Sequence, residues 1–257
     1  MGSRMRPTVR LVCAVILMAG LLAGWGSPSR AESDDTNDHD PLESVNRKIF
    51  WFNDKVDDYV LVPVATVWDT ILPARVEKCL SNFFGNLRFP IVAGNGLLQG
   101  KFEQAGSDVA RFAVNSTVGL AGFFDPASGW GLEEHNEDFG QTLGYWGVGP
   151  GPYLVLPFFG PSNPRDTVGL VADSFSTVYP FFIDFEYVFA ARATDLINAR
   201  ALVLTEVREF KAASFDYYVA VRNAYIQRRK VLVSDLRGMS EEEKEDLYKI
   251  EDDNGGE

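Results

Sequence analysis

A stretch rich in glycine and proline, residues 140–164, most limits the folds that this chain can adopt. It reads GQTLGYWGVGPGPYLVLPFFGPSNP, and eleven of its twenty-five residues are glycine or proline. Both residue types interrupt regular structure, and proline also removes a backbone hydrogen-bond donor. A flexible linker would be polar, whereas the other residues here are mostly aromatic or aliphatic. We therefore expect an irregular apolar element that shapes a cavity or a membrane contact.

The segments around this element predict a mainly α-helical protein. After the helix-start signal Asp40-Pro41, apolar residues recur at spacings of three and four, so a first amphipathic helix is expected to end by Pro63. Further helices are expected over residues 64–72, 74–87 (interrupted by Gly85 and Pro90), 91–99, 102–115, 164–178 and 186–230. Residues 117–139 are expected to form a loop, and residues 153–157 a short strand.

The two ends of the chain differ from its middle. Three arginines precede an apolar run over residues 11–25, which is short and glycine-rich for a membrane span, and Ser29-Arg30-Ala31 offers a cleavage site. We interpret residues 1–31 as a cleaved export signal, with an uncleaved anchor as the alternative. Residues 32–40 and 236–257 are acidic and are expected to be disordered. Residues 41–235 are expected to form one domain.

Charge and cysteine content argue against a nucleic-acid partner and against a disulfide within the chain. The net charge of −12 is concentrated in the acidic ends, and the middle has no basic run, so nucleic acid is not an expected partner. Cys13 lies in the export signal, which leaves Cys79 without a disulfide partner. The apolar neighbours Val76, Leu80 and Phe83 predict a buried thiol at Cys79.

The sequence lacks the usual signs of an enzyme. His39 lies in an acidic segment, and His135 lacks a second histidine at metal-ligand spacing, so no metal site is expected. No nucleophile elbow and no nucleotide-binding loop is present. The glycines of residues 147–151 resemble a dinucleotide fingerprint only superficially, because a proline interrupts them and no strand–turn–helix frame surrounds them. We expect no catalysis and no cofactor. The alternative of a hydrolase would require a base close to Ser162.

Several polar residues next to aromatics or glycines are candidates for function. They are Asn95, Asn115, Asn136, Asp138, Gln141, Arg165 and Asp166. In one interpretation they cap helices and satisfy irregular backbone. In the other, some of them line a polar passage or meet a lipid head group.

Several long stretches together carry a family resemblance. They are DPLESVNRKIFWFN (40–53), NFFGNLRFPIVAGNGLLQG (82–100), RFAVNSTVG (111–119) and EDFGQTLGYWGVGPGPYLVLPFFGPSNPRDTVG (137–169), followed by Asp173 and Tyr179-Pro180. With them the chain resembles the VacJ/MlaA family of intermembrane phospholipid transport proteins over roughly residues 40–235.

The resemblance implies a fold and a function. The fold would be all-α and ring-like, with amphipathic helices lying in the inner leaflet of a Gram-negative outer membrane. The protein would passively remove misplaced phospholipid from the outer leaflet through an amphipathic channel. It would pass the lipid to a periplasmic carrier and associate with a porin trimer. A structural adaptor that binds porins without moving lipid is the alternative.

Membrane attachment is the point at which the sequence departs from the family. Leu22-Ala23-Gly24-Trp25 resembles a lipobox, but Trp25 stands where the lipidated cysteine would be, so no lipidation is expected. Aromatic residues could bind the membrane surface instead. The candidates are Phe50, Trp51, Phe52, Phe181, Phe182 and Phe185.

The lipid conduit also has candidate residues. Hinge-like glycines enclose Leu120, Phe123 and Phe124, so residues 117–139 are expected to be a mobile gate, with a rigid packed loop as the alternative. The polar candidates for the conduit or gate are Asn136, Gln141, Arg165 and Asp166.

Overall fold

The computed structural model describes residues 40–177 and 183–234, which belong to one compact unit that begins at Asp40. The predicted export signal, the acidic residues 32–39 and 236–257, Phe181 and Phe182 lie outside the described residues. The helices are α2 (Glu43–Val56), the π-helical turn η2 (Asp57–Leu61), α3 (Val62–Ile71), α4 (Ala74–Leu87), α5 (Phe89–Leu98), α6 (Phe102–Thr117), α7 (Pro126–Gly129), α8 (Phe139–Tyr145), α9 (Pro164–Ser176), α10 (Phe185–Ala201), α11 (Leu204–Ala213) and α12 (Tyr217–Ser234). The two strands are β1 (Leu154–Leu156) and β2 (Gly160–Ser162).

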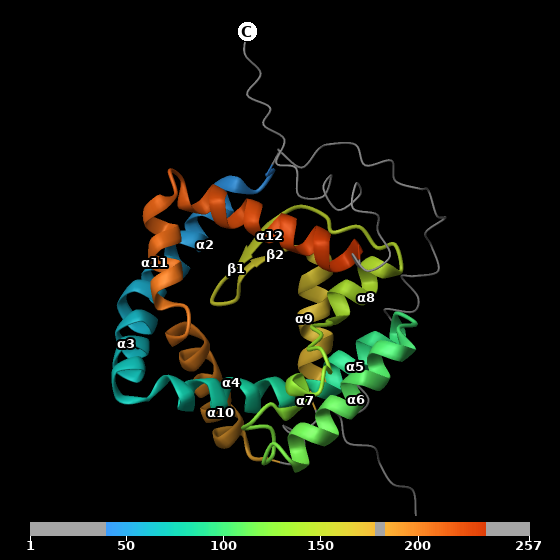
Figure 1. Ribbon diagram of the computed structural model, residues 1–257. Coiled ribbons are helices and arrows are strands. Elements are labelled where there is room, and N and C mark those ends of the chain that lie inside the picture. The colour runs from blue at the N-terminus through green and yellow to red at the C-terminus, as the bar shows by residue number, and fades with distance from the viewer. Residues whose placement is uncertain (1–39, 178–182, 235–257) are drawn as a thin grey trace, which may run out of the picture. The chain divides into compact units, whose positions relative to one another are not determined.

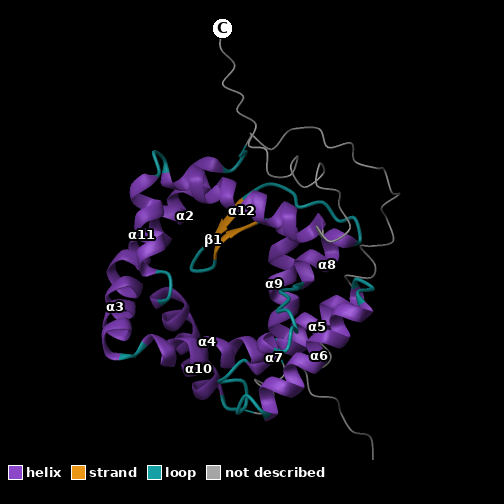
Figure 2. Ribbon diagram, in the orientation of Figure 1, coloured by secondary structure: helices purple, strands orange, loops and turns teal. Residues whose placement is uncertain are grey.

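The described helices surround a centre that is free of helices in the ribbon view, with α10 beside α4 and α11 beside α3 (Figure 1), and Figure 2 shows how little of the unit is strand. The first and last helices are neighbours, because Arg47 of α2 pairs with Asp216 at the start of α12 at 2.8 Å. Next to this ion pair, the Phe50 ring meets the Tyr218 ring edge-on with centroids 5.4 Å apart. The prediction of a mainly helical, ring-like domain is confirmed.

The buried apolar residues of the described unit form small, separate clusters. One joins α3 to α10 and α11 through Ala65, Ala201 and Leu204. A second joins β1 to α12 through Tyr153, Val155 and Tyr218, with Phe50 packed against it. Helices in a ring pack mainly against their immediate neighbours, so many large apolar side chains remain exposed.

The predicted end of the first helix at Pro63 is wrong. The chain continues through η2 into α3, and the Val62 N–H donates to the Asp57 carbonyl across the π-helical turn. Pro63 lies in the first turn of α3, where its missing N–H is tolerated. The wider π-helical turn just before it lets the helix continue past the proline ring.

The glycine- and proline-rich element is less irregular than predicted. Its first residues belong to α8, which begins because the Asp138 side chain accepts a hydrogen bond from the Gln141 N–H at 2.8 Å. Its later residues form the antiparallel hairpin β1–β2, in which Val155 is paired with Pro161. The single strand predicted over residues 153–157 is therefore one half of a hairpin.

Two further expectations can be compared with the structure. Residues 186–230 are mostly helical, as predicted, and they divide into α10, α11 and α12; α12 begins where Asp216 Oδ1 accepts a hydrogen bond from the Val219 N–H at 3.2 Å. Cys79 is half-buried rather than buried as predicted, and the buried residue of α4 is Glu77. Residues 117–139 are mainly loop, as predicted, and contain only the short α7.

Candidate functional site

Three polar residues predicted for the conduit meet in a buried network between α8, α9 and α12. Gln141 is 2% exposed and Arg165 7% exposed. The Arg165 Nε donates to Asp166 Oδ1 at 3.0 Å. Gln141 Nε2 donates to Asp138 Oδ2 at 3.1 Å, which links α8 to the same network. The structure thus brings together Gln141, Arg165 and Asp166 at a helix junction.

Arg229 of α12 is the cation at the centre of this network. Its Nη1 donates to Asp138 Oδ2 at 2.6 Å, and its Nη2 donates to Asp166 Oδ1 at 2.8 Å. Burial alone would raise the pKa of both carboxyls, but the hydrogen bonds and the nearby positive charge outweigh it. The pKa of Asp138 and the pKa of Asp166 are therefore held below the ordinary range, and both groups are carboxylates at neutral pH.

Tyr225 and Asn163 complete the network. The Tyr225 hydroxyl donates to Asp166 Oδ2 at 2.5 Å, and burial together with this bond raises the pKa of Tyr225. Asn163 starts α9, because its side chain accepts from the Asp166 N–H at 2.8 Å. Asn163 Nδ2 also donates to the Tyr225 hydroxyl at 2.9 Å. This geometry fixes α12 against α8 and α9, a contact between helices that neither interpretation of these polar residues included.

Neither Arg229 nor Tyr225 was among the predicted residues. Each lies in an ordinary helical sequence more than fifty residues from its partners in α8 and α9. They could have been sought by a physical argument: if Asp138 and Asp166 are largely buried, their carboxylates need a cation nearby.

A second buried polar cluster lies between α5, α6 and α8. Glu137 accepts hydrogen bonds from Gln99 Nε2 at 2.9 Å and from Gln104 Nε2 at 2.8 Å, and it pairs with Lys101 at 2.9 Å. The Thr142 hydroxyl, fully buried in α8, donates to Asn95 Oδ1 at 2.8 Å. Asn95, a predicted polar candidate, is thereby used to join α5 to α8.

The predicted gate loop has exposed apolar side chains on a firmly bonded backbone. Leu120 is 64% exposed and Phe124 is 53% exposed. The Phe124 N–H donates to the Gly119 carbonyl at 2.9 Å, and the Phe123 ring stacks on Phe83 with centroids 4.8 Å apart. A Cβ at Gly119 would lie 2.4 Å from the Phe124 carbonyl oxygen. These contacts hold the backbone of the loop around Gly119 in one conformation, and whether the loop acts as a gate stays a prediction.

Side-chain contacts also hold the middle and the C-terminal part of this loop. Arg111 pairs with Asp125 at 2.7 Å, and Asn115 Nδ2 donates to Asp125 Oδ1 at 2.9 Å. Asn136, at the far end, is exposed and accepts from Arg88 Nη2 at 3.3 Å. Of the four polar residues predicted for the conduit or gate, Asn136 is the one that is exposed.

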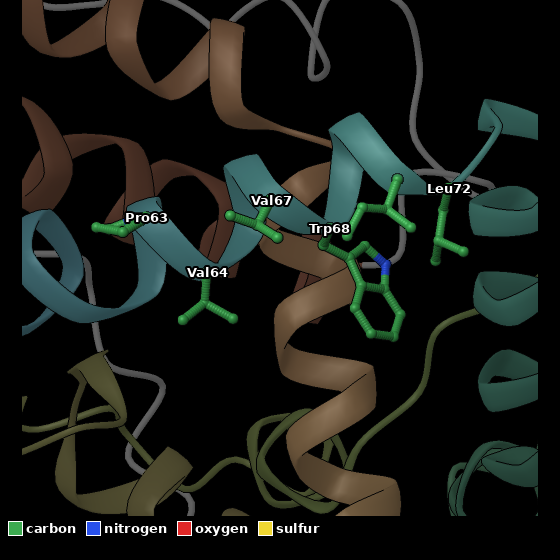
Figure 3. A pocket seen from close by; sticks show the side chains of 6 residues that line it. Pro63, Val64, Val67, Trp68 and Leu72 are labelled. Atoms are coloured by element: carbon green, nitrogen blue, oxygen red, sulfur yellow. The ribbon is translucent and has the colours of Figure 1, made fainter.

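An apolar groove of about 490 Å³ runs along α3. It is lined by Pro63, Val64, Val67, Trp68, Ile71 and Leu72, which Figure 3 shows along one side of the helix. Ala65 of α3 packs on α10, and Trp68, at the edge of the groove, donates from Nε1 to Asn198 Oδ1 of α10 at 3.2 Å. The groove is a continuous apolar surface with room for a chain-like apolar ligand.

The predicted membrane-contact residues divide into two groups. Phe50 is half-buried and belongs to the core, where it packs against Tyr218. Trp51 is 63% exposed and Phe185 is 78% exposed. Phe52 is 40% exposed, next to Trp51 on α2. Exposed aromatics of this kind can bind at a membrane interface.

No single described helix is long and apolar enough to cross a membrane. The helical segments Glu43–Ile71 and Ala74–Leu87 meet that test of length and composition together, but the chain bends by 117° between them.

The described residues contain no arrangement that favours catalysis. Ser162 hydrogen-bonds to Thr167 Oγ1 at 3.0 Å and to the Asn163 carbonyl at 3.3 Å, and neither group is a base. His135 Nδ1 lies 2.6 Å from Asp108 Oδ1 on α6. No group of three histidine, cysteine or acidic side chains in residues 40–177 and 183–234 is placed to hold a metal ion.

Comparison with known proteins identifies the family. The chain is 37% identical over 229 residues to the "Intermembrane phospholipid transport system lipoprotein MlaA" of Escherichia coli (strain K12), covering 86% of this chain and 88% of that one. It is 32% identical over 241 residues to the protein of the same name in Haemophilus influenzae, covering 90% and 94%. An uncharacterized protein of Rickettsia bellii is 36% identical over 198 residues, covering 76% and 77%.

A solved structure supports the same assignment. It is described as the "Structural basis for maintenance of bacterial outer membrane lipid asymmetry", and it matches with a TM-score of 0.67 and 34% identity over 76% of this chain and 99% of that one. The family model described as "MlaA lipoprotein" matches residues 38–232, which include both the buried network and the groove on α3. The chain belongs to the MlaA lipoprotein family.

Proposed function

We propose that this protein is the outer-membrane component of an intermembrane phospholipid transport system and maintains the lipid asymmetry of that membrane. The observation that carries the proposal is the match along residues 38–232 to a family whose Escherichia coli member is named for this system. The structural relative described in terms of outer-membrane lipid asymmetry points to the same process.

The physical requirement for moving a phospholipid supports this function. Exposing an acyl chain to water costs roughly 0.8 kcal/mol per CH₂ group, so a sixteen-carbon chain needs shielding worth about 12 kcal/mol. The helices with exposed apolar faces and the groove along α3 supply such shielding. The exposed polar groups between them, including Asn136, can accompany the head group.

The proposal includes a route for the lipid. Phospholipid leaves the outer leaflet, passes the centre of the helical ring and reaches a periplasmic carrier. The chain has no nucleotide-binding loop in its sequence, so partners set the direction and the passage is passive. In this proposal Leu120, Phe123 and Phe124 form an apolar rim of the passage, and the network of Gln141, Arg165 and Asp166 holds the wall of the passage in shape.

Attachment to the membrane is a separate part of the proposal. Trp51 and Phe185 insert into the inner leaflet and hold the protein at the periplasmic side of the outer membrane. A porin trimer provides the lateral support. The adaptor function, in which the protein binds a porin and moves no lipid, uses the same surfaces and leaves the groove on α3 without a role.

Deleting the gene tests the proposal in cells. The deletion is expected to place phospholipid in the outer leaflet and to make the cell sensitive to detergent, because misplaced lipid is no longer removed. Surface labelling of phospholipid measures the first effect, and growth in detergent measures the second. Complementation with the intact gene is the control, and outer-leaflet phospholipid that stays unchanged in a clean deletion would contradict the proposal.

A further inference from the structure

The hairpin β1–β2 is fastened to α2 by two asparagine side chains. Asn46, which is 2% exposed, donates to the Tyr153 carbonyl at 2.9 Å and accepts from the Val155 N–H at 3.0 Å. The Nδ2 and Oδ1 atoms of Asn46 therefore satisfy one backbone group just before β1 and one within it. The amide acts on this strand as a neighbouring strand would.

Asn53 repeats this arrangement seven residues later, near the tip of the hairpin. Its Nδ2 donates to the Leu156 carbonyl at 2.9 Å, and its Oδ1 accepts from the Phe158 N–H at 2.8 Å. Residues seven apart lie on the same face of a helix, two turns from one another. A two-stranded hairpin is marginally stable alone, so these bonds make it a rigid extension of α2.

The tip of the hairpin presents two exposed aromatic rings. Phe158 is 73% exposed and Phe159 is 71% exposed. Phe158 has a φ of +66°, a left-handed conformation that is unfavourable for a residue with a side chain. The Phe52 ring meets the Phe158 ring edge-on with centroids 5.2 Å apart. The fold thus holds a strained backbone in place and leaves apolar surface uncovered, a combination typical of functional sites.

The position of the hairpin indicates what covers these rings. Figure 1 shows the hairpin inside the ring of helices, and Figure 3 shows it on the side of α3 toward which Val64 points. Phenyl rings have no hydrogen-bonding group, so they favour an acyl chain over a polar head group. Two rings on a rigid support contact a chain without ordering a loop first, which keeps the entropic cost of each contact low.

We propose that Phe158 and Phe159 form an acyl-chain contact site inside the ring, across from the groove on α3. The inference rests on the proposed phospholipid function and adds the element that contacts the lipid tail. The hairpin is a fixed guide in this account, because Asn46 and Asn53 hold it whether or not lipid is present.

Photocrosslinking in cells tests the contact directly. A benzophenone amino acid replaces Phe159 in the full chain, and in a second variant it replaces Phe215, which is fully exposed between α11 and α12. The probe at 159 is expected to give a phospholipid adduct, detected by mass spectrometry, at a yield at least about tenfold above that at 215. Equal lipid yields at the two positions, or an adduct at 159 with protein alone, would overturn the inference.

Substitutions give a second, independent measurement. The double variant F158A/F159A removes both rings and is expected to restore lipid asymmetry to a deletion strain about tenfold less well than the intact chain, since burying one such ring is worth at least a factor of ten in an equilibrium. The matched control, F215A, is expected to complement fully. Full activity of F158A/F159A would refute the site and leave the proposed function intact, whereas an intact chain that fails to complement would refute the function itself.

Discussion

Replacing Arg229 with alanine is expected to lower the free energy of unfolding by about 3 kcal/mol. The change leaves the carboxylates of Asp138 and Asp166 without the cation that contacts them at 2.6 and 2.8 Å. Removing one partner of a buried ion pair costs about this much, because the remaining charge is poorly solvated. Urea unfolding of the full chain in detergent, followed by circular dichroism, measures the loss.

The neighbouring residue provides the control for this substitution. Arg228 is exposed on α12, and its replacement by alanine is expected to change stability by no more than about 0.5 kcal/mol. Equal losses in R228A and R229A would mean that the network does not fasten α12 to α8 and α9.

The pH dependence of the free energy of unfolding tests the same contacts of Arg229 with Asp138 and Asp166 in a second way. The pKa values of Asp138 and Asp166 are lowered in the folded protein, so both groups contribute stability above the ordinary aspartate pKa of about 3.9 and lose it as pH falls through their folded values. In R229A both carboxyls lose the positive charge and the hydrogen bonds of Arg229, so the pKa values of Asp138 and Asp166 rise relative to those in the intact chain. The stability gap between intact chain and variant is therefore expected to narrow below about pH 4. A gap that stays constant from pH 7 to pH 3 would contradict this assignment.

Replacing Gly169 with alanine is expected to cost about 3 kcal/mol of stability. A Cβ at this position would lie 2.4 Å from the backbone nitrogen of Gly140 and 2.8 Å from its Cα, where α9 crosses α8. Backbone atoms cannot rotate away as a flexible side chain can, so the two helices must separate. The separation would also strain the Asp138–Arg229–Asp166 bridge. Thermal unfolding of the variant measures the cost.

A glycine in open space is the matched control for Gly169. A Cβ at Gly106, in α6, meets no atom within 4 Å. Its replacement by alanine is expected to stabilise the protein by up to about 1 kcal/mol, because alanine favours the helix. If G106A destabilised the protein as much as G169A, the close crossing of α8 and α9 could not be the cause.

Local patterns in the sequence were sufficient to predict most of the helices. The start of α9 follows from Asn163-Pro164, and the ranges predicted for α4 and α6 lie close to the observed ones. Local patterns gave a wrong prediction in two places. Pro63 was expected to end a helix, and the π-helical turn before it allows the helix to continue. The strand β2 was missed because Gly160 and Pro161 have low strand propensity, and its pairing with β1 overrides that preference.

The same limit applies to the candidate site. Gln141, Arg165 and Asp166 stand out in the sequence as polar residues in apolar surroundings, and the structure does bring them together. Their main cation, Arg229, lies in a polar helical stretch that has no distinguishing feature. The two asparagines that fasten the hairpin are equally inconspicuous, because nothing local tells that Asn46 faces the backbone of Tyr153.

Lipid transfer by the purified full chain tests the central claim most directly. The protein is inserted into vesicles that contain a fluorescent phospholipid, and a soluble lipid-binding acceptor is added outside. We expect protein-dependent transfer of the labelled lipid to the acceptor without nucleotide. A chain that binds a porin trimer in the same membrane but transfers no more lipid than protein-free vesicles would contradict the account and favour the adaptor function.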